Sequence, residues 1–596
     1  MPPNIDVEAE ASQLEKYWNT RNQQLLADRA VLALTKPAAK KNITRWVMND
    51  PKVMFDTTVA LLSTYPPRFR LPLSRNFNSE ERERMAKVER FLTGLLHLLE
   101  GRYFATGRVS FLRELAYWVC GGWYAAFFRV HKPREGVVEF IGELFDPITV
   151  YPEWDHEGLR RLARVYEVDG HLALAMAENW GVNARIDDPQ GKYKIINFWK
   201  RISPLDRQPE VYNIINVGGT NVKEITLEEG LDHIPILVGA IGQPEKTSDD
   251  WQRRVGESVI AADRDMYEYK NEMVSLAIEL VKEQTRPDLI SKSHSGRPVV
   301  KKEDIKGKGT IIPVRLEESL APLRNVEIPA ELHNLLSIVE GGIQRGGLPY
   351  IVYGGLPFEL SGFAISQLMA AIKYKAGPYA NAMESFLESM ASEFLLQYGS
   401  GSFPPVELST TDARSMRKGL FFVEGFKKSD MPKTSYVEAT IPLTSAMDRI
   451  QQMAFARQAL QPPQILSRET LWDEIFDVQD PDGELDRIMK DQTLELPGVK
   501  QVAAVEKVRQ MAADARTAGD SVRAKSLTTY ADFMETQLRA QTQARSPEKT
   551  PGMKPEEMPP EMGAESPDMA RAALGLRPPG VAPRKPLITR LGETQG

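Results

Sequence analysis

Residues 345–362 read RGGLPYIVYGGLPFELSG, a stretch dense in residues that interrupt regular structure. It holds five glycines and two prolines in 18 positions. Glycine reaches backbone conformations that other residues avoid, and proline cannot donate a backbone hydrogen bond, so this density predicts a loop. The residues on both sides have helical character, and the loop is therefore expected to join two helices.

The flanking segments extend this pattern outward. Residues 329–344 predict the helix before the loop. Residues 363–398 predict a long helix after it, kinked at Gly377 and Pro378 because proline lacks the amide hydrogen that an interior helical turn needs. Upstream, residues 253–284 carry a loose apolar stripe and predict another helix. The polar residues 286–308 between the two upstream helices have a net charge of +4. Two helices with a small insert between them form a helical hairpin with an elaborated tip.

The outer parts of the chain differ from this region. Apolar residues at helical spacing between 80 and 100 predict a helix, and the first 130 residues are interpreted as helical. From 137 to 241, short β-branched and aromatic runs predict a β-rich insert, with a hairpin connection at Gly218 and Gly219. Residues 403–443 predict short strands again, and residues 444–541 predict further helices. The sequence thus indicates an α+β fold that is mainly helical.

The amino-acid composition limits the classes of protein to which the chain can belong. The chain has 596 residues, 42% hydrophobic and 26% charged, which is typical of a globular protein of several structural regions. The net charge of −6 disfavours a protein that grips nucleic acid over its whole surface, while a local basic patch stays open. Residues 541–596 hold 10 of the 41 prolines and few aromatics, which predicts a disordered tail.

Cysteine content and hydropathy set further limits. A single cysteine, Cys120, excludes a disulfide within the chain and a cysteine-rich zinc site. The N-terminal residues are acidic and lack an apolar core, unlike a signal peptide. The longest apolar run, residues 115–128, contains two glycines and is too short to span a bilayer, so it is expected to be a buried element of a soluble protein.

The search for catalytic motifs finds none. The chain has no P-loop, no H-E-x-x-H and no G-x-S-x-G sequence. Its seven histidines do not occur at metal-ligand spacing. Cys120 lies among aromatic residues and is expected to be a buried apolar side chain. We therefore expect no catalytic residue, no metal site and no cofactor.

The order of these parts resembles that of a bacteriophage portal protein, the head–tail connector family. LDHIPILVGAIG (231–242) resembles the strand that leads into a portal stem, and GESVIAADRDMYEYKNEMVSLAIEL (256–280) resembles the first stem helix. Residues 329–370 resemble the second stem helix, the tunnel loop and the start of a kinked wing helix. FDPITVYPEWD (145–155) resembles a wing strand, and ILSRETLWDEIFDVQDPDGELDRIM (465–489) resembles the helix pair after the wing. The resemblance extends over residues 10–530.

The resemblance implies a layout of nine parts. These are a helical N-terminal part of the wing (1–136), a β-rich wing (137–250), a first stem helix (251–285), a clip (286–328), a second stem helix (329–345), a tunnel loop (346–362), a kinked wing helix with strands (363–462), a C-terminal helical crown (463–540) and a disordered proline-rich tail (541–596).

The resemblance also implies a function. Portal proteins form a ring, usually of twelve subunits, at one capsid vertex, and double-stranded DNA passes through the axial channel during packaging and ejection. The implied partners are further copies of the chain, the DNA, the terminase large subunit, the major capsid protein and a neck or adaptor protein, without a membrane. The implied location is the virion, after assembly in the host cytoplasm, and the implied role is non-enzymatic.

Two sets of site residues are expected on this basis. The constriction of the channel would use Gly346, Gly347, Tyr350, Ile351, Val352, Tyr353, Gly354, Gly355, Leu356 and Phe358, with the glycines as hinges. The same apolar side chains could instead pack into a neighbouring subunit. A clip facing DNA or terminase would use Lys292, Arg297, Lys301, Lys302, Lys306 and Lys308, although a solvated strand hairpin accounts for these residues equally well.

Two other classes of protein stay open. One is an enzyme of the packaging machine, such as a terminase-like ATPase or nuclease, which the missing P-loop disfavours. The other is a monomeric virion scaffold or adaptor that binds protein rather than DNA. An ATPase assay separates the first class from a portal, and particle images separate the second.

Overall fold

The computed structural model of the chain divides into two units, residues 1–458 and residues 459–596, and each is described by itself. The described residues are 5–35, 45–72, 79–179, 182, 186, 188–203, 209–228, 231–242, 255–285, 289–292, 319–322, 329–347, 362–411, 421–432, 436–442, 485, 488–489, 492–493, 497–517 and 521–544. Within them the fold is mixed α+β and more helical than stranded, in agreement with the predicted class.

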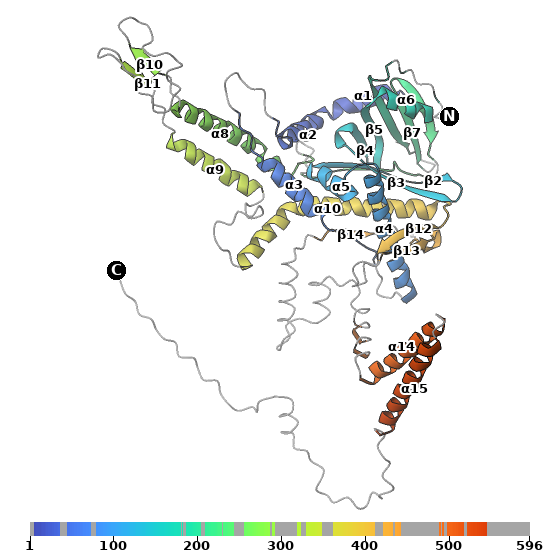
Figure 1. The fold of residues 1–596 in the computed structure, drawn as a ribbon. Coiled ribbons are helices and arrows are strands. Elements are labelled where there is room, and N and C mark those ends of the chain that lie inside the picture. Colours follow the sequence, from blue (N-terminus) through green and yellow to red (C-terminus); the bar gives the residue numbers. More distant parts are fainter. Residues whose placement is uncertain are drawn as a thin grey trace, which may run out of the picture. The chain divides into compact units, whose positions relative to one another are not determined.

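Helices form the N-terminal part of the first unit (Figure 1). They are α1 (Val7–Tyr17), α2 (Asn19–Leu32), α3 (Asp50–Ser63), α4 (Ser79–Ala105) and α5 (Phe111–Cys120). The predicted helix at 80–100 is confirmed as α4, and its apolar stripe is buried at Val88, Leu92, Leu95, Leu96 and Leu99. Ser110 caps the start of α5, because its hydroxyl oxygen accepts a hydrogen bond from the amide of Arg113.

The predicted helical region ends earlier than expected. The apolar run 115–128 is buried for most of its length but divides at Gly121 and Gly122, where α5 stops and strand β2 (Trp123–Arg134) begins. Gly122 has a φ of +96°, and a Cβ there would lie 2.1 Å from the carbonyl oxygen of Gly256. Only glycine fits this position. The prediction of a helical segment 1–136 is therefore wrong from residue 123 onward.

Two antiparallel sheets follow and confirm the β-rich prediction. The first is three-stranded in the order β3 (Val137–Phe145), β2, β9 (Ile236–Ala240). The second joins consecutive strands β4 (Val150–Asp155), β5 (Gly158–Asp169), β6 (Lys192–Ile202), β7 (Glu210–Val217) and β8 (Thr220–Leu227). Gly218 and Gly219, both at positive φ, join β7 to β8 as predicted. Helix α6 (Gly170–Asn179) was not predicted.

The remaining elements of the first unit are mainly helical. They are α8 (Arg264–Thr285), preceded by the short helix η2 (Ala261–Asp263), then β10 (Leu289–Lys292), β11 (Ser319–Pro322), α9 (Ala330–Gly346), α10 (Gly362–Ser400), β12 (Val406–Thr411), β13 (Phe421–Phe426) and β14 (Glu438–Thr440). β10 pairs with β11, β12 with β13, and β14 with β1 (Arg68–Arg70), all antiparallel.

The main hydrophobic core surrounds α10. Phe386 and Phe394 of this helix contact Phe128 of β2 edge to face, with ring centroids 5.7 and 5.3 Å apart. Tyr398 stacks on Phe91 of α4 at 5.6 Å. Aromatic pairs of this kind add stabilisation beyond the apolar area they bury. The second half of α10 thus fastens the N-terminal helices to the three-stranded sheet.

The second unit contains a helical hairpin. Helices α14 (Pro497–Thr517) and α15 (Ser521–Ala544) are antiparallel, because Arg509 pairs with Glu535 and Arg516 donates a hydrogen bond to Thr528. Alanines 512, 524 and 531 are buried between the two helices, which lets their backbones approach closely. The predicted C-terminal helices are confirmed here, and residues 443–484 lie outside the described part.

Candidate functional site: the helical hairpin and its base

A helical hairpin is the part of the first unit that the sequence singled out. In Figure 1, α8 and α9 lie side by side, with the strand pair β10–β11 at one end and α3 near the other. In the strand pair, Leu289 is opposite Pro322 and Lys292 is opposite Ser319. The predicted arrangement of helix, small insert and helix is thus present in the described residues.

The first half of α8 is fixed to the rest of the unit by polar contacts. The Lys270 ammonium lies 3.4 Å from Asp50 of α3 and 3.5 Å from Glu340 of α9. Asn271 Oδ1 accepts a hydrogen bond of 2.8 Å from the amide of Met48, and Ser275 Oγ accepts one of 3.0 Å from the amide of Trp46. These contacts hold the root of the hairpin.

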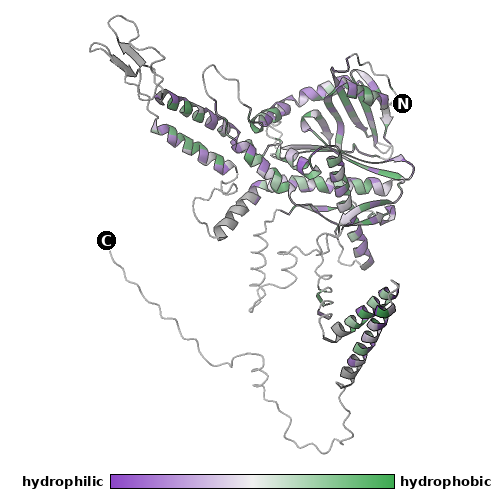
Figure 2. Cartoon of the chain, in the orientation of Figure 1, coloured by the Kyte–Doolittle hydropathy of each residue, from purple (hydrophilic) through white to green (hydrophobic). Residues whose placement is uncertain are grey.

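Large apolar side chains of the hairpin are exposed to solvent. Tyr269 and Leu276 of α8 are seven residues apart, which places them on one helical face, and Tyr269 is 62% exposed. On α9, Leu335 and Ile338 are three residues apart, and Ile338 is 70% exposed. Figure 2 shows apolar and polar residues interleaved along both helices. Clustered exposed apolar residues mark interaction surfaces more often than isolated ones do.

At the base of the hairpin, the end of α9 meets the start of α8. Asp263 directly precedes α8 and is 1% exposed, and no described residue hydrogen-bonds its Oδ2. A Cβ added to Gly346 would lie 1.8 Å from Asp263 Oδ1. The glycine backbone therefore packs directly on the carboxylate. Burial raises the pKa of Asp263 to about 6, and the positive charge of Lys375 on α10 acts in the opposite direction.

The predicted constriction lies mostly outside the described residues. Gly346 is the last residue of α9, and Gly347 follows it and donates its amide to the carbonyl oxygen of Ile343 at 2.8 Å. Neither glycine has a positive φ. Glycine is needed at these positions because neighbouring atoms leave no room for a Cβ, and not because of an unusual backbone conformation. Tyr350, Ile351, Val352, Tyr353, Gly354, Gly355, Leu356 and Phe358 are not among the described residues.

The clip and kink residues are also placed only in part. Lys292 is the last residue of β10, and Arg297, Lys301, Lys302, Lys306 and Lys308 are outside the described part. Gly377 and Pro378 lie inside α10, which continues through them, and Figure 1 shows its ribbon changing direction along its length. A Cβ at Gly377 would meet no atom within 4 Å.

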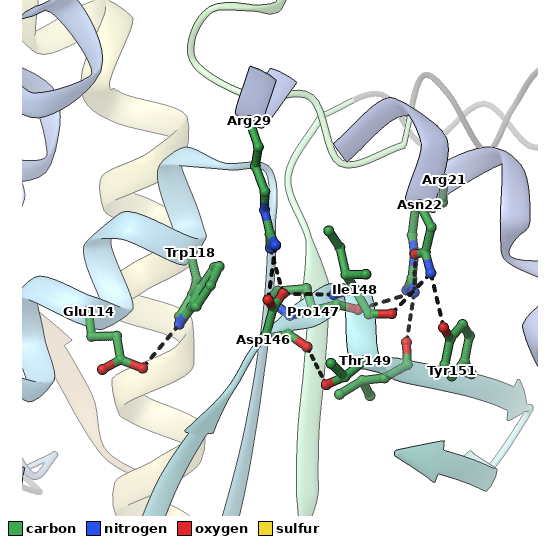
Figure 3. A network of polar contacts seen from close by, with 11 residues as sticks. Arg21, Asn22, Arg29, Glu114, Trp118, Asp146, Pro147, Ile148, Thr149 and Tyr151 are labelled. Carbon is green, nitrogen blue, oxygen red and sulfur yellow. Dashed lines mark hydrogen bonds and ion pairs between the residues drawn. The ribbon is translucent and has the colours of Figure 1, made fainter. Parts of the chain in front are cut away.

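A buried polar network, which sequence reasoning missed, ties α2 to the turn before β4 (Figure 3). The Arg21 guanidinium donates to the carbonyl oxygens of Pro147 and Val150 at 3.2 and 2.7 Å. Arg29 forms two hydrogen bonds with Asp146 at 2.9 and 2.5 Å. Burial lowers the pKa of Arg21 to about 10, with Tyr151 and Asp146 opposing that shift. The network is structural, because each partner is a turn carbonyl or a neighbouring side chain.

A second missed pair joins the loop before β9 to α10. His233 Nε2 lies 2.7 Å from Glu393 Oε2, and His233 Nδ1 lies 2.5 Å from Asp232. The hydrogen bond to Glu393 raises the pKa of His233 to about 9, so the ring is charged at neutral pH. Gln397, one turn further along α10, donates a hydrogen bond to Glu393. Its side-chain amide also donates to the carbonyl oxygen of Phe128 and accepts from the amide of Val130, both on β2.

The described residues contain no group of three or more histidine, cysteine, aspartate or glutamate side chains placed to hold a metal ion. Cys120 is fully buried, and burial raises the pKa of its thiol. Within the same part of the chain, no helix combines the length and apolar content needed to cross a membrane.

The chain matches no protein-family model, and no curated protein matches it.

Proposed function

We propose that this protein is a portal protein, which forms a ring at one capsid vertex and serves as the channel for packaging and ejecting double-stranded DNA. The packaging terminase would dock on the clip, and the neck proteins would dock after packaging. The role is structural and non-enzymatic, and the location is the virion.

The helical hairpin of α8 and α9 is the observation that supports this proposal most directly. Two helices rooted by Lys270, Asn271 and Ser275 support a small strand pair, and the second helix ends at the glycine- and proline-rich segment that precedes α10. The motifs that resemble a portal stem, clip, tunnel loop and wing helix occur in this same order. A clip at the end of a two-helix stem accounts for the strand pair β10–β11, which is too small to be stable alone.

The exposed apolar residues of the hairpin support a ring. Tyr269, Leu276 and Ile338 lie on helices that have few neighbours in a single copy, so much of their apolar surface stays in water. Packing α8 of one copy against α9 of the next would bury these side chains. Such a head-to-tail contact between different surfaces repeats from copy to copy, and it gives a ring when the rotation between copies closes.

Charge is compatible with a DNA conduit. Each phosphate that a protein neutralises adds affinity, and a tightly held duplex would not slide. A chain with a net charge of −6 avoids that outcome over most of its surface. The lysines between 292 and 308 could still contact DNA or terminase at one level of the channel.

Sedimentation velocity of the purified chain tests the proposal. A portal is expected to sediment as an assembly of about a dozen copies, and an ATPase assay on the same sample is expected to show no hydrolysis. A sedimentation coefficient that stays that of a single copy at every concentration would favour a monomeric adaptor. ATP hydrolysis that copurifies with the chain would favour an enzyme of the packaging machine.

A further inference from the structure

An aromatic pocket lies away from the hairpin, between α1, the strands β4 and β5, and β9. Its volume is about 670 Å³, and its lining includes Tyr17, Trp18, Trp123 and Trp154. Trp18 is packed edge to face against Trp123 and Trp154, with ring centroids 5.5 and 6.1 Å apart. Trp18 and Trp123 are buried, whereas Tyr17 and Trp154 are exposed. The aromatic surface of the pocket that solvent reaches therefore belongs to Tyr17 and Trp154.

The backbone of β9 forms one wall of this pocket. The amide of Ile241 donates a hydrogen bond to the carbonyl oxygen of Gly122, and the amide of Phe128 donates one to the carbonyl oxygen of Pro235. Because hydrogen-bonded pairs alternate along an antiparallel strand pair, the N–H and C=O groups of Val238 and Ala240 point away from β2. β9 is an edge of its sheet, and no hydrogen bond to the backbone of Val238 or Ala240 comes from the described residues. Val238, Gly239 and Ala240 all line the pocket.

The edge of β9 lacks the usual protection against pairing. Sheet edges are commonly blunted by charged residues or proline. The other edges of the two larger sheets carry them: Glu139 and Glu143 on β3, Pro152 and Glu153 on β4, and Lys223 on β8. β9 reads ILVGA, without a charge or a proline. An unprotected edge beside an open aromatic pocket is suited to pairing with another strand.

The charged groups around the aromatic pocket favour an uncharged side chain inside it. The Arg21 guanidinium already lies 4.7 Å from the ring of Trp18 and 5.0 Å from that of Trp123, so a second cation at these rings would be repelled. An anion at Arg161 would have to compete with Glu153, Glu10 and Gln13, which the three guanidinium nitrogens already bond. A neutral side chain meets neither obstacle.

We propose that the pocket and the outward edge of β9 together bind an extended, uncharged segment of a partner protein. The segment adds a strand beside Val238 and Ala240, so main-chain hydrogen bonds supply affinity. Because side chains alternate along a strand, one aromatic or large aliphatic side chain enters the pocket and its neighbours stay outside. This site does not depend on the proposed ring.

Capped heptapeptides of alternating threonine and valine test the proposal by titration calorimetry on the full chain. The central residue is phenylalanine, leucine, lysine or glutamate, and a fifth peptide carries the phenylalanine with N-methyl groups along one backbone edge. The phenylalanine and leucine peptides are expected to bind, and the other three at least tenfold more weakly. Equal binding by the N-methylated or charged peptides, or no binding by any peptide, overturns the proposal.

Matched variants locate the site. Trp154→Ala, which removes an exposed pocket ring, and Ala240→Pro, which removes an outward amide, are expected to weaken binding of the phenylalanine peptide at least tenfold. Phe104→Ala removes an exposed ring outside the pocket lining and is expected to leave binding unchanged. If Trp154→Ala instead abolishes self-association of the chain, the occupant is a second copy and the separate partner is refuted.

Discussion

At the residue scale, Gly346 shows how closely the base of the hairpin is packed. Gly346→Ala would place a methyl group 1.8 Å from Asp263 Oδ1, and overpacking of this kind lowers the free energy of unfolding by about 1–3 kcal/mol. Gly341→Ala is the matched control in the same helix, since a Cβ there meets no atom within 4 Å. It is expected to stabilise the protein by about 1 kcal/mol, because alanine favours helix more than glycine does.

Urea unfolding of both variants measures this difference. Equal effects of the two substitutions would show that the end of α9 does not rest on the Asp263 carboxylate.

Asp263 also predicts a pH dependence of stability. Its pKa is raised from an ordinary value of 3.8 to about 6, so the folded state binds a proton more tightly than the unfolded state does. Ionisation therefore costs stability, which falls as pH rises from about 4 to 6. Asp263→Asn removes this dependence, and the wild type is expected to gain stability relative to the variant as pH falls through that range. Parallel pH profiles of the two proteins would contradict the assignment.

His233 predicts a loss of stability in the same direction, with rising pH, but in a more alkaline range. Its pKa is raised from 6.5 to about 9 by Glu393, so its ion pair contributes fully below pH 6.5. That contribution is lost as pH rises through about 9. The melting temperature of His233→Gln is expected to lie below that of the wild type at pH 6 and to approach it at pH 10. His156→Gln, at a side chain 89% exposed, is the control and should track the wild type throughout.

The partners of Asp263 and His233 could not be predicted from the sequence. Glu393 is 160 residues from His233, and Gly346 is far along the chain from Asp263, so no local pattern connects either pair. The same holds for Arg21, which reaches carbonyl groups of a turn more than 120 residues away. Contacts of this kind arise from tertiary packing, which hydrophobic periodicity does not specify.

At the element scale, the hairpin predicts a distinctive cross-linking pattern. If α8 of one copy packs on α9 of the next, a protein carrying both Leu276→Cys and Leu335→Cys would cross-link on oxidation into a ladder of many bands. A twofold contact would stop at dimers. Native Cys120 is fully buried and should not interfere. Each single substitution is the control and should give at most dimers on denaturing gels.

Elements were more predictable than contacts. Helical spacing located α4 and α8, and β-branched runs located β3 and the strands from β5 to β8, because burial on one side leaves a periodic pattern. The helices α9 and α10 were predicted as the segments that flank the glycine-rich loop. The boundary at residue 123 was missed because LAYWVCGGWYAAFF is apolar throughout and has no period that separates helix from strand. The change of element occurs at Gly122, whose role depends on the approach of Gly256 from over a hundred residues away.

At the scale of the whole molecule, the proposed portal is a ring of copies of one chain arranged around an axis. The hairpin is rooted by polar contacts at one end and exposes apolar faces along its length, an arrangement that a single copy leaves incomplete. A ring would complete it. The predicted constriction and most of the basic clip lie outside the described residues, so the proposed roles of Tyr350, Phe358 and Lys302 stay predictions from sequence.

Negative-stain electron microscopy of the purified full-length chain tests the central claim most directly. The account predicts closed rings with a central opening, formed by the wild type and lost in a variant with Tyr269→Glu and Ile338→Glu, while Val423→Glu, at an exposed strand residue of β13, leaves them intact. Only single particles without an opening, at every concentration and salt condition, would contradict it.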